Sequence, residues 1–443
     1  MVANKLLIVA LSALTFISTQ AIAQKVDFTE YNLPNGLHVI LHQDHTAPVV
    51  AVSVIYHVGS RNEVAGKTGF AHFFEHLLFE GSENIKRGDF NKLILAKGGE
   101  GIANTTQDRT FYYEVFPSNE FKMGLWLESE RMMHPVINEI GVKTQNEVIK
   151  EENRLTFDNH PFGNIINDIG EDLFTIHPYH NRVIGSMKDL DSAKLGEFKD
   201  FFKQFYVPNN AVLTISGDIN LVTIRPLIES YFGPVPRGKD VTYTPIIEKP
   251  ITKQIIDTAY DANIQIPAIL IAYRMPGKAE KDFKVMRMIS NILSGDSSAR
   301  INRTMIDEKK TTQYVFAFSY ELEDYGMYMV GASPHNGAVI SDLLMDMGTE
   351  VARLQKDLIS PADYQKQQNH FEDRFVSENT SMLGISENLA DGYLSYNKNT
   401  GKINSELTEI RSITREQIRE AARKYLSPNQ RLVLYYLPKK VKS

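Results

Sequence analysis

Two histidines and a glutamate stand close together in the segment His72-Phe73-Phe74-Glu75-His76. In a helix, positions i and i+4 lie on one face about a turn apart, so the imidazoles of His72 and His76 could bind the same metal ion. Glu75 would lie close to that face. It could accept a proton from a water molecule activated by zinc, which is the chemistry of peptide hydrolysis.

The residues around these side chains are strongly apolar, which predicts a largely buried helix: Phe70, Phe73, Phe74, Leu77 and Leu78. Burying two imidazoles and a carboxylate there would cost free energy unless a partner such as a metal ion compensates. The alternative is a chance pattern in which the histidines only pack or face solvent. We favour the metal site, because two histidines and an acid at this spacing are more specific than a lone histidine.

A catalytic zinc ion needs a third protein ligand and an open position for water. A second helix is predicted over residues 145–154, and it carries three candidate ligands: Glu147, Glu151 and Glu152. The local pattern does not choose among them, since a run of charges is usually a solvated face. Val148 and Ile149 are expected to mark the buried side of this helix, which would turn Glu152 inward and Glu151 outward.

The motif H-x-x-E-H and its spacing resemble peptidase family M16, an inverzincin family, and most of all its bacterial two-domain members. In that family a glutamate ligand follows the second histidine by about 76 residues, and Glu152 follows His76 by 76. The resemblance implies that His72, His76 and Glu152 bind Zn²⁺ and that Glu75 is the general base. Many members have an acid seven residues before the distal ligand, where this chain has Gln145.

The stretch Gly98–Tyr113 resembles the family pattern G-G-x-x-N-A-x-T-x-x-D-x-T-x-Y-Y. In the family this is an edge strand that pairs with the substrate backbone, as any extended peptide can. The resemblance implies that a peptide adds along Ala103 to Tyr113 and that Ala103, Asn104 and Thr105 bind it, with Asn104 close to the scissile bond. The alternative is a glycine-rich turn before an ordinary strand.

Many family members bind the substrate carbonyl with an arginine and a tyrosine seven residues apart. In the matching segment, residues 297–314, Tyr314 stands at the tyrosine position and Asp307 at the arginine position. Arg300 or Arg303 could substitute, but we interpret the pair as broken. The resemblance then implies a zinc-bearing subunit whose partner, a second M16-like chain or else a second copy, supplies the arginine and tyrosine.

The N-terminus has the pattern of a secretory signal peptide over residues 1–23: Lys5, an apolar run from Leu6 to Ile17, and a cleavage site after Ala23. The run is too short for a transmembrane anchor, so a periplasmic or secreted protein is expected. The 443 residues include no cysteine, which excludes thiolate zinc ligands and suits an oxidising compartment. A net charge of −6 with mixed signs argues against nucleic-acid binding.

Two distant segments of the chain have similar sequence patterns. The segment Phe205–Ile215 recurs as Tyr425–Tyr435, with Pro208 and Pro428 220 residues apart. This predicts an α+β fold of two homologous domains, each a mostly antiparallel sheet packed against helices.

The predicted domains are a zinc-bearing N-terminal domain over residues 24–240 and a C-terminal domain over 241–443, which has no metal motif. The linker is expected around Gly233 to Pro250, which is rich in glycine, proline and charge. His177 and His180, in a segment that also echoes the family, are expected to be loop and packing residues and not ligands.

The sequence therefore predicts a zinc metalloendopeptidase that hydrolyses peptides or unfolded polypeptides, with Glu75 as general base. The alternative is a non-catalytic structural or peptide-binding subunit of an M16-type complex, which would need no metal at His72, His76 and Glu152. A zinc hydrolase acting on another substrate is a third hypothesis, against which the substrate-strand pattern argues weakly.

Overall fold

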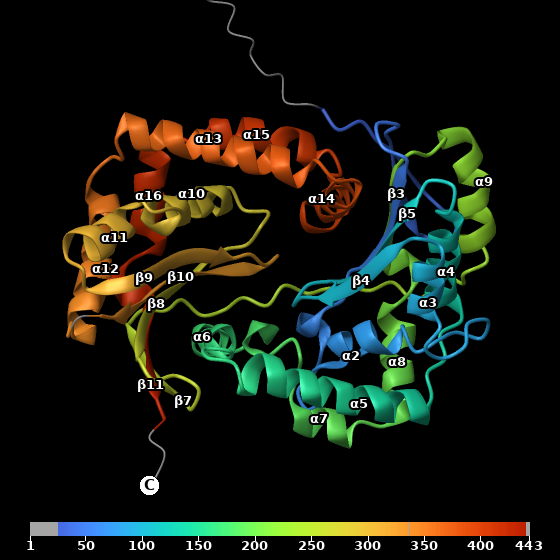
Figure 1. Cartoon of the computed structure of the whole chain (residues 1–443), viewed down its shortest axis with the longest axis horizontal. Coiled ribbons are helices and arrows are strands. Elements are labelled where there is room, and N and C mark those ends of the chain that lie inside the picture. The colour runs from blue at the N-terminus through green and yellow to red at the C-terminus, as the bar shows by residue number, and fades with distance from the viewer. Residues whose placement is uncertain (1–24, 336, 440–443) are drawn as a thin grey trace, which may run out of the picture.

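The computed structural model describes residues 25–335 and 337–439. The predicted signal peptide lies outside these residues. Two sheets, each with its own helices, stand side by side (Figure 1). None of the helices in the described part of the chain combines the length and the apolar character that a membrane crossing requires.

The first half contains a six-stranded sheet with the order β1-β2-β6-β3-β5-β4. Only β2 and β6 pair in parallel; the other neighbours are antiparallel. The central strand β3 is built almost entirely of buried residues, many of them β-branched, as expected for a strand covered on both faces. The strands are β1 (Thr29–Asn32), β2 (His38–Gln43), β3 (Val49–Tyr56), β4 (Glu100–Thr105), β5 (Thr110–Pro117) and β6 (Ala211–Gly217).

The helices of this half include the two that carry the predicted zinc ligands, α2 and α5. In chain order they are α2 (Phe70–Leu77), α3 (Phe90–Ala96), α4 (Lys122–Met133), α5 (Glu139–Asn153), α6 (Ile165–Leu173), α7 (Met187–Ser192), α8 (Leu195–Phe205) and α9 (Leu221–Phe232).

The second half repeats the arrangement. Its sheet has the order β7-β11-β8-β10-β9, which is the order of the first sheet without β1, and again only one pair, β7 and β11, is parallel. Pro208 and Pro428 each open a short 3₁₀ turn just before the last strand of their sheet. The predicted duplication and the mostly antiparallel sheets are confirmed. The strands are β7 (Ile255–Asp261), β8 (Ala268–Pro276), β9 (Thr312–Tyr320), β10 (Tyr325–Pro334) and β11 (Arg431–Pro438).

One helix of the second half, α13 (Pro361–Glu378), has a clear start signal. Ser360 accepts a hydrogen bond from the backbone N–H of Asp363 and is followed by Pro361 at the first helical position, so both residues fix the start of α13. The helices are α10 (Asp282–Ser294), α11 (Arg300–Asn302), α12 (Ile340–Lys356), α13 (Pro361–Glu378), α14 (Met382–Ser395), α15 (Lys402–Arg411) and α16 (Arg415–Tyr425).

One helix of each half packs against the sheet of the other half. α14 covers β3 and β6, where Leu389 joins a core with Ile40 and Val212. α6 covers β8 and β11, where Ile169 joins a core with Leu432. Figure 1 shows α14 beside the first sheet and α6 beside the second. The exchange is reciprocal, since Leu389 follows Ile169 by 220 residues, the offset of the repeat.

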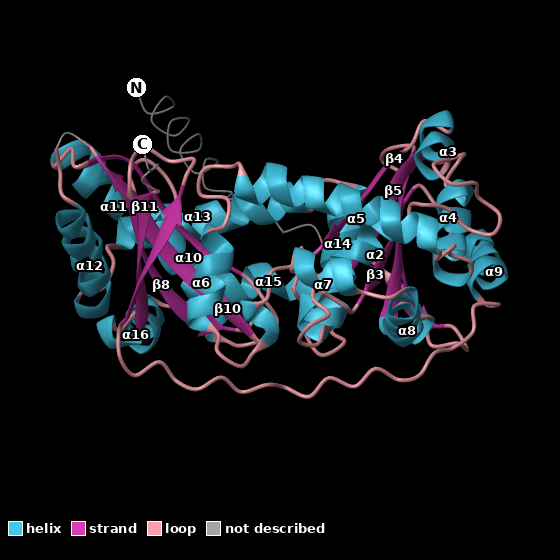
Figure 2. Cartoon of the chain, turned by 90° about the horizontal axis from the view of Figure 1, so that it is seen from below, coloured by secondary structure: helices cyan, strands magenta, loops and turns pink. Residues whose placement is uncertain are grey.

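Residues 233–254 contain no helix or strand and pass from α9 to β7 along one side of the molecule (Figure 2). Two side chains anchor this segment. Tyr243 donates a hydrogen bond to Asp324, and Glu248 accepts three from the backbone N–H groups of Thr175, Ile176 and His177. We propose residue 240, within this segment, as the domain boundary.

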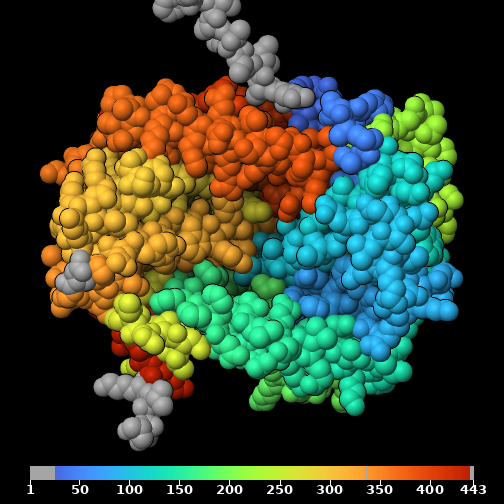
Figure 3. Space-filling model, viewed as in Figure 1, coloured from blue at the N-terminus to red at the C-terminus, as the bar shows by residue number. Residues whose placement is uncertain are grey.

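A buried ionic cluster joins the two halves. Arg61, 4% exposed, lies 3.1 Å from Asp108 of its own half and 2.6 Å from Glu323, in the turn between β9 and β10. Asp108 also accepts hydrogen bonds from the Tyr179 hydroxyl and the Glu323 backbone N–H. The cluster fixes the turn of the second sheet to the first half. The space-filling view shows a depression in the surface where the halves face each other (Figure 3).

Candidate metal centre and catalytic site

Helix α2 begins at a tight contact between two glycines. Gly69 precedes the helix with φ of +89°, a conformation that favours glycine, and a side chain on Gly185 would collide with Gly69 at 2.3 Å. The buried carboxyl group of Glu63 accepts hydrogen bonds from the backbone N–H of Gly69 at 2.7 Å and of Ala71 at 2.9 Å. These bonds satisfy donors that a helix start leaves without partners.

Buried tyrosines hold the carbonyl groups of the same helix. The Tyr112 hydroxyl donates to the carbonyl oxygen of Phe74 at 2.8 Å, and the Tyr206 hydroxyl donates to that of Ala71 at 3.2 Å. The predicted apolar residues of α2 are all buried in the core of the first half. The helix that carries His72, Glu75 and His76 is thus fixed at its start, its carbonyls and its apolar face.

Helix α5 presents Glu152 to α2. Asn138 caps α5 by accepting a hydrogen bond from the backbone N–H of Gly141, and Ile149 is fully buried. The prediction that Val148 is buried is wrong: its exposed fraction is 43%, because only the face through Ile149 turns toward α2. Glu152, three residues after Ile149, still faces inward. Glu147 and Glu151 face solvent, where they pair with Lys150 and Arg154.

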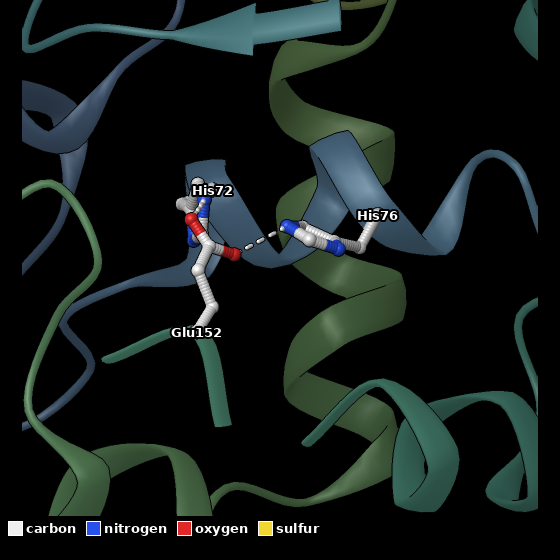
Figure 4. A group of neighbouring side chains, drawn as sticks. All are labelled: His72, His76 and Glu152. Atoms are coloured by element: carbon white, nitrogen blue, oxygen red, sulfur yellow. Dashed lines mark ion pairs between the residues drawn. The ribbon is translucent and has the colours of Figure 1, made fainter. Parts of the chain in front are cut away.

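Three side chains from these two helices converge on one point (Figure 4). His72 Nε2 lies 3.4 Å from Glu152 Oε1, and His76 Nε2 lies 3.1 Å from Glu152 Oε2. One ligand atom from each residue lies within 4.8 Å of the others, the only such group of three or more histidines or acids found in the described chain. Both imidazoles therefore direct the same ring nitrogen toward one carboxylate.

The electrostatics of this group suit a cation. Burial opposes the ionisation of Glu152, but the hydrogen bonds and charges of His72 and His76 outweigh that cost and hold the pKa of Glu152 well below its usual range. The carboxylate is therefore ionised at neutral pH. Two imidazole nitrogens and a carboxylate, with no thiolate, are a donor set that fits zinc. The three side chains are 10% to 36% exposed, so solvent reaches the point where they meet.

Glu75 lies beside this group in a small open cavity of about 170 Å³. The cavity is lined by residues of α2, α3 and β4 and of the chain just after α2: Glu75, His76, Phe79, Asn91, Gly101, Ile102 and Ala103. Glu75 Oε2 accepts a hydrogen bond of 2.7 Å from the Thr105 hydroxyl. A carboxylate next to a metal-binding group and open to solvent can act as a general base.

The stretch predicted as one substrate-binding strand is a hairpin. Of the two hairpin strands, only β4 lies at an edge of the sheet. Residues 106–109 form a turn, and β5 after it is paired on both sides. The edge open to a peptide is therefore Glu100–Thr105, not the whole stretch to Tyr113. Side chains alternate along a strand, so Ala103 and Thr105 face α2. Asn104 faces the other way and accepts a hydrogen bond from Arg109 at 2.7 Å.

The two positions that the resemblance assigns to the arginine–tyrosine pair are Asp307 and Tyr314, and both lie in the second half. Tyr314 is 65% exposed near the start of β9, with its ring 5.9 Å from that of Phe316. Asp307 lies in the π-helix η5 (Arg303–Glu308), in which Arg303 pairs with Glu308. Neither Tyr314 nor Asp307 is among the described residues that line the cavity at Glu75.

Other residues that the sequence singled out take structural places. His177 is buried between the two halves, 3.1 Å from Asp324 of the second half. His180 lies in the short 3₁₀ turn that follows His177. Gln145, which replaces the acid of many family members, donates to Glu80 at 2.5 Å. The sequence does not predict the contacts of Glu63, Tyr112 and Tyr206. The two tyrosines bind residues far apart in the chain, and Glu63 lies on a loop without periodicity.

The chain is similar to several known proteases. The chain is 28% identical to the zinc protease PqqE of Helicobacter pylori over 81% of this chain and 82% of that protein. It is 22% identical to the uncharacterized zinc protease YmxG of Bacillus subtilis over 91% and 97% of the two chains. The crystal structure of a protease from Helicobacter pylori superimposes with a TM-score of 0.87, at 25% identity, over 93% of this chain and 99% of that one.

A longer neighbour is the periplasmic protease PqqL from Escherichia coli, with a TM-score of 0.78 and 18% identity, matched over 93% of this chain but only 48% of that one. The family model described as Insulinase (Peptidase family M16) matches residues 38–186, which include His72, Glu75, His76 and Glu152. The model described as Peptidase M16 inactive domain matches residues 192–371. Between them these models match most of the chain, which therefore belongs to peptidase family M16.

Proposed function

We propose that this protein is a zinc metalloendopeptidase that hydrolyses peptides or unfolded polypeptides. The observation that carries the proposal is the convergence of His72, His76 and Glu152 beside the solvent-accessible carboxylate of Glu75. His72, His76 and Glu152 would hold the zinc ion. A bound Zn²⁺ supplies a Lewis acid for the scissile carbonyl and lowers the pKa of water at its open position.

Glu75 performs the proton transfers. Its carboxylate accepts a proton from the attacking water and returns it to the amine nitrogen that leaves when the peptide bond breaks. The free edge of β4 binds the substrate as an added strand, so that backbone hydrogen bonds supply most of the affinity. Ala103, which faces α2 and lines the cavity, would place the scissile bond next to Glu75.

We infer that the active assembly contains a second M16-like subunit, either a different chain or a second copy. An acid, Asp307, stands at the position where the resemblance expects an arginine, and Tyr314 does not line the cavity at Glu75. A donor to the developing oxyanion can contribute several kcal/mol to catalysis, about 3–4 in a measured case, so the gap is costly unless a partner fills it. The match to only 48% of PqqL, a chain about twice as long, supports a pairing of two such units.

The proposed location is the periplasm or the exterior of the cell. It rests on the signal-peptide pattern of residues 1–23 and on the absence of cysteine. The name of PqqL as a periplasmic protease is in keeping with it.

The experiment that tests the function uses the chain from residue 24 onward, purified alone. Bound zinc is quantified, and an internally quenched peptide is assayed with and without a chelator. Turnover that needs zinc and disappears in Glu75→Gln supports the proposal. The matched control is Glu147→Gln, which removes an exposed carboxylate of α5 and leaves activity unchanged.

Two other results would redirect the proposal. A chain that binds zinc but is inert alone points to a missing subunit, and activity should then appear with the partner. A chain that binds no zinc at His72, His76 and Glu152 would support the alternative, a structural or peptide-binding subunit, and would end the proposal of catalysis.

A further inference from the structure

Thr105 connects the substrate-binding edge to the general base. It is the last residue of β4, and its hydroxyl lies 2.7 Å from Glu75 Oε2 on α2. Among the described residues, this hydroxyl is the only hydrogen-bond donor found on the Glu75 carboxylate. The two residues are 30 positions apart in the sequence, so the contact depends on how the sheet packs against the helix.

The geometry points to Thr105 as a positioning residue for Glu75: its hydroxyl holds one carboxylate oxygen so that the other faces the reacting water. This inference rests on the proposed function and deepens it. It differs from the role expected from the sequence, in which Thr105 binds substrate directly.

A hydroxyl group suits this task better than a backbone N–H. A carboxylate only accepts hydrogen bonds, but a carboxylic acid also donates one, and a hydroxyl can do both. The Thr105 hydroxyl can therefore donate to Glu75 before the proton transfer and still accept from it afterwards. Glu75 stays in one place while it takes the proton from water and delivers it to the leaving nitrogen.

The turn after Thr105 is held by the second half of the chain. Asp108 accepts from the backbone N–H of Glu323 at 2.9 Å, and Gln107 accepts from the Tyr320 hydroxyl at 3.1 Å. Arg109 pairs with Glu387 of α14 at 2.5 Å. Three side chains in a row are thus fixed by the second domain, and Thr105 transmits that fixed position to Glu75.

The test compares two substitutions at one position. Thr105→Val removes the hydroxyl but keeps the branched shape, and Thr105→Ser keeps the hydroxyl. With a quenched peptide and the zinc-loaded assembly, we expect kcat to fall about 10- to 100-fold in Thr105→Val, with KM changed less than about threefold. Thr105→Ser should stay within a few-fold of wild type. Zinc content should be the same in all three.

A second readout does not depend on activity. In crystal structures of the metal-free variants, the Glu75 carboxylate should keep its position in Thr105→Ser and move or take several conformations in Thr105→Val. Thr349→Val, on an exposed face of α12, makes the same chemical change far from α2 and should alter neither readout. If Thr105→Val folds poorly, Thr105→Ala against Thr105→Ser makes the same comparison.

Four outcomes would overturn this inference, and one of them would overturn the proposed function as well. Wild-type kcat in Thr105→Val, or an equally low kcat in Thr105→Ser, would show that the hydroxyl does not position Glu75, while the proposed function would stand. An unmoved Glu75 carboxylate in metal-free Thr105→Val would overturn the inference in the same way. A wild-type assembly without chelator-sensitive turnover would instead overturn the proposed function and this inference with it.

Discussion

Arg61 and Glu323 form an ion pair of 2.6 Å that joins the two halves of the chain inside the protein. Removing one partner of a buried pair leaves the other charge without compensation, which costs about 3–5 kcal/mol. We expect Arg61→Met to lower the free energy of unfolding by about that amount, because Asp108 would lose its paired arginine and Glu323 would keep only its contact with His57. Urea unfolding of the purified chain measures the change.

The control for this variant is Arg237→Met. Arg237 pairs with Asp240 on the surface, where an ion pair contributes about 0–1 kcal/mol. The prediction is wrong if Arg61→Met unfolds at the same urea concentration as Arg237→Met.

The cap formed by Glu63 should matter for both stability and metal binding. Glu63→Ala would leave the buried N–H groups of Gly69 and Ala71 without acceptors, at about 1–3 kcal/mol each. Since these groups start the helix that carries His72 and His76, we also expect zinc affinity to fall about tenfold. Thermal unfolding and zinc titration measure the two effects. Glu308→Ala, on an exposed side chain, should change neither.

Glu152 should be the residue that couples metal binding to stability. At a zinc concentration 100 times its dissociation constant, a bound ion stabilises the folded state by about 2.7 kcal/mol. We expect a chelator to lower the melting temperature of the wild type but not of Glu152→Gln. Glu151→Gln, one residue earlier and exposed, should respond as the wild type does. A chelator effect that survives in Glu152→Gln would place the metal elsewhere.

A cavity of about 470 Å³ between the two halves predicts that the stability of the protein depends on pH. It is lined by Asp168 and Asp172 of α6 and by Asp257 of β7. Burial and the neighbouring acids raise the pKa of Asp172 to about 6, and burial also raises that of Asp168 to about 6. Both values exceed that of an aspartate in an unfolded chain, about 3.9. The stability that protonation contributes is therefore full below about pH 4 and is lost as the pH rises through 6.

Asp172→Asn removes one of these charges. It should raise the melting temperature by about 1–3 °C at pH 7.5, a small effect because Asp172 is partly exposed, and by about a third as much at pH 4.5. Scanning calorimetry in the presence of a chelator checks this at both pH values. Asp200→Asn, an exposed aspartate of α8, should give no difference between them. Equal shifts for Asp172→Asn at both pH values would contradict the prediction.

Local patterns predicted the parts of the site that lie within one helix. The spacing of His72 and His76 fixes their relation, because four residues make about one turn of a helix whatever surrounds it. The repeat marked by Pro208 and Pro428 predicted the duplicated sheets. The position of Ile149 indicated that Glu152 turns inward, and the family resemblance selected Glu152 among its neighbours. The prediction for Val148 was wrong because both faces of α5 carry an apolar residue.

Contacts between distant segments could not be predicted in this way. The sequence pattern predicts a substrate edge that continues to Tyr113, since strand propensity does not show where a chain turns from the edge strand to its neighbour. The hydrogen bond from Thr105 to Glu75 depends on the register of β4 against α2. The apolar faces of α6 and α14 would look the same whichever sheet they covered, so their exchange left no signal in the sequence.

The exchanged helices also affect how the protein is made. The ribosome completes the last strand of the first sheet at Gly217, but the helix that covers β3 and β6 begins only at Met382. At common rates of protein synthesis, that interval lasts on the order of ten to thirty seconds. During this time the nascent first half shows an uncovered apolar face, which is a natural site for a chaperone. A gene divided between the two halves would yield two polypeptides, and neither could complete its core without the other.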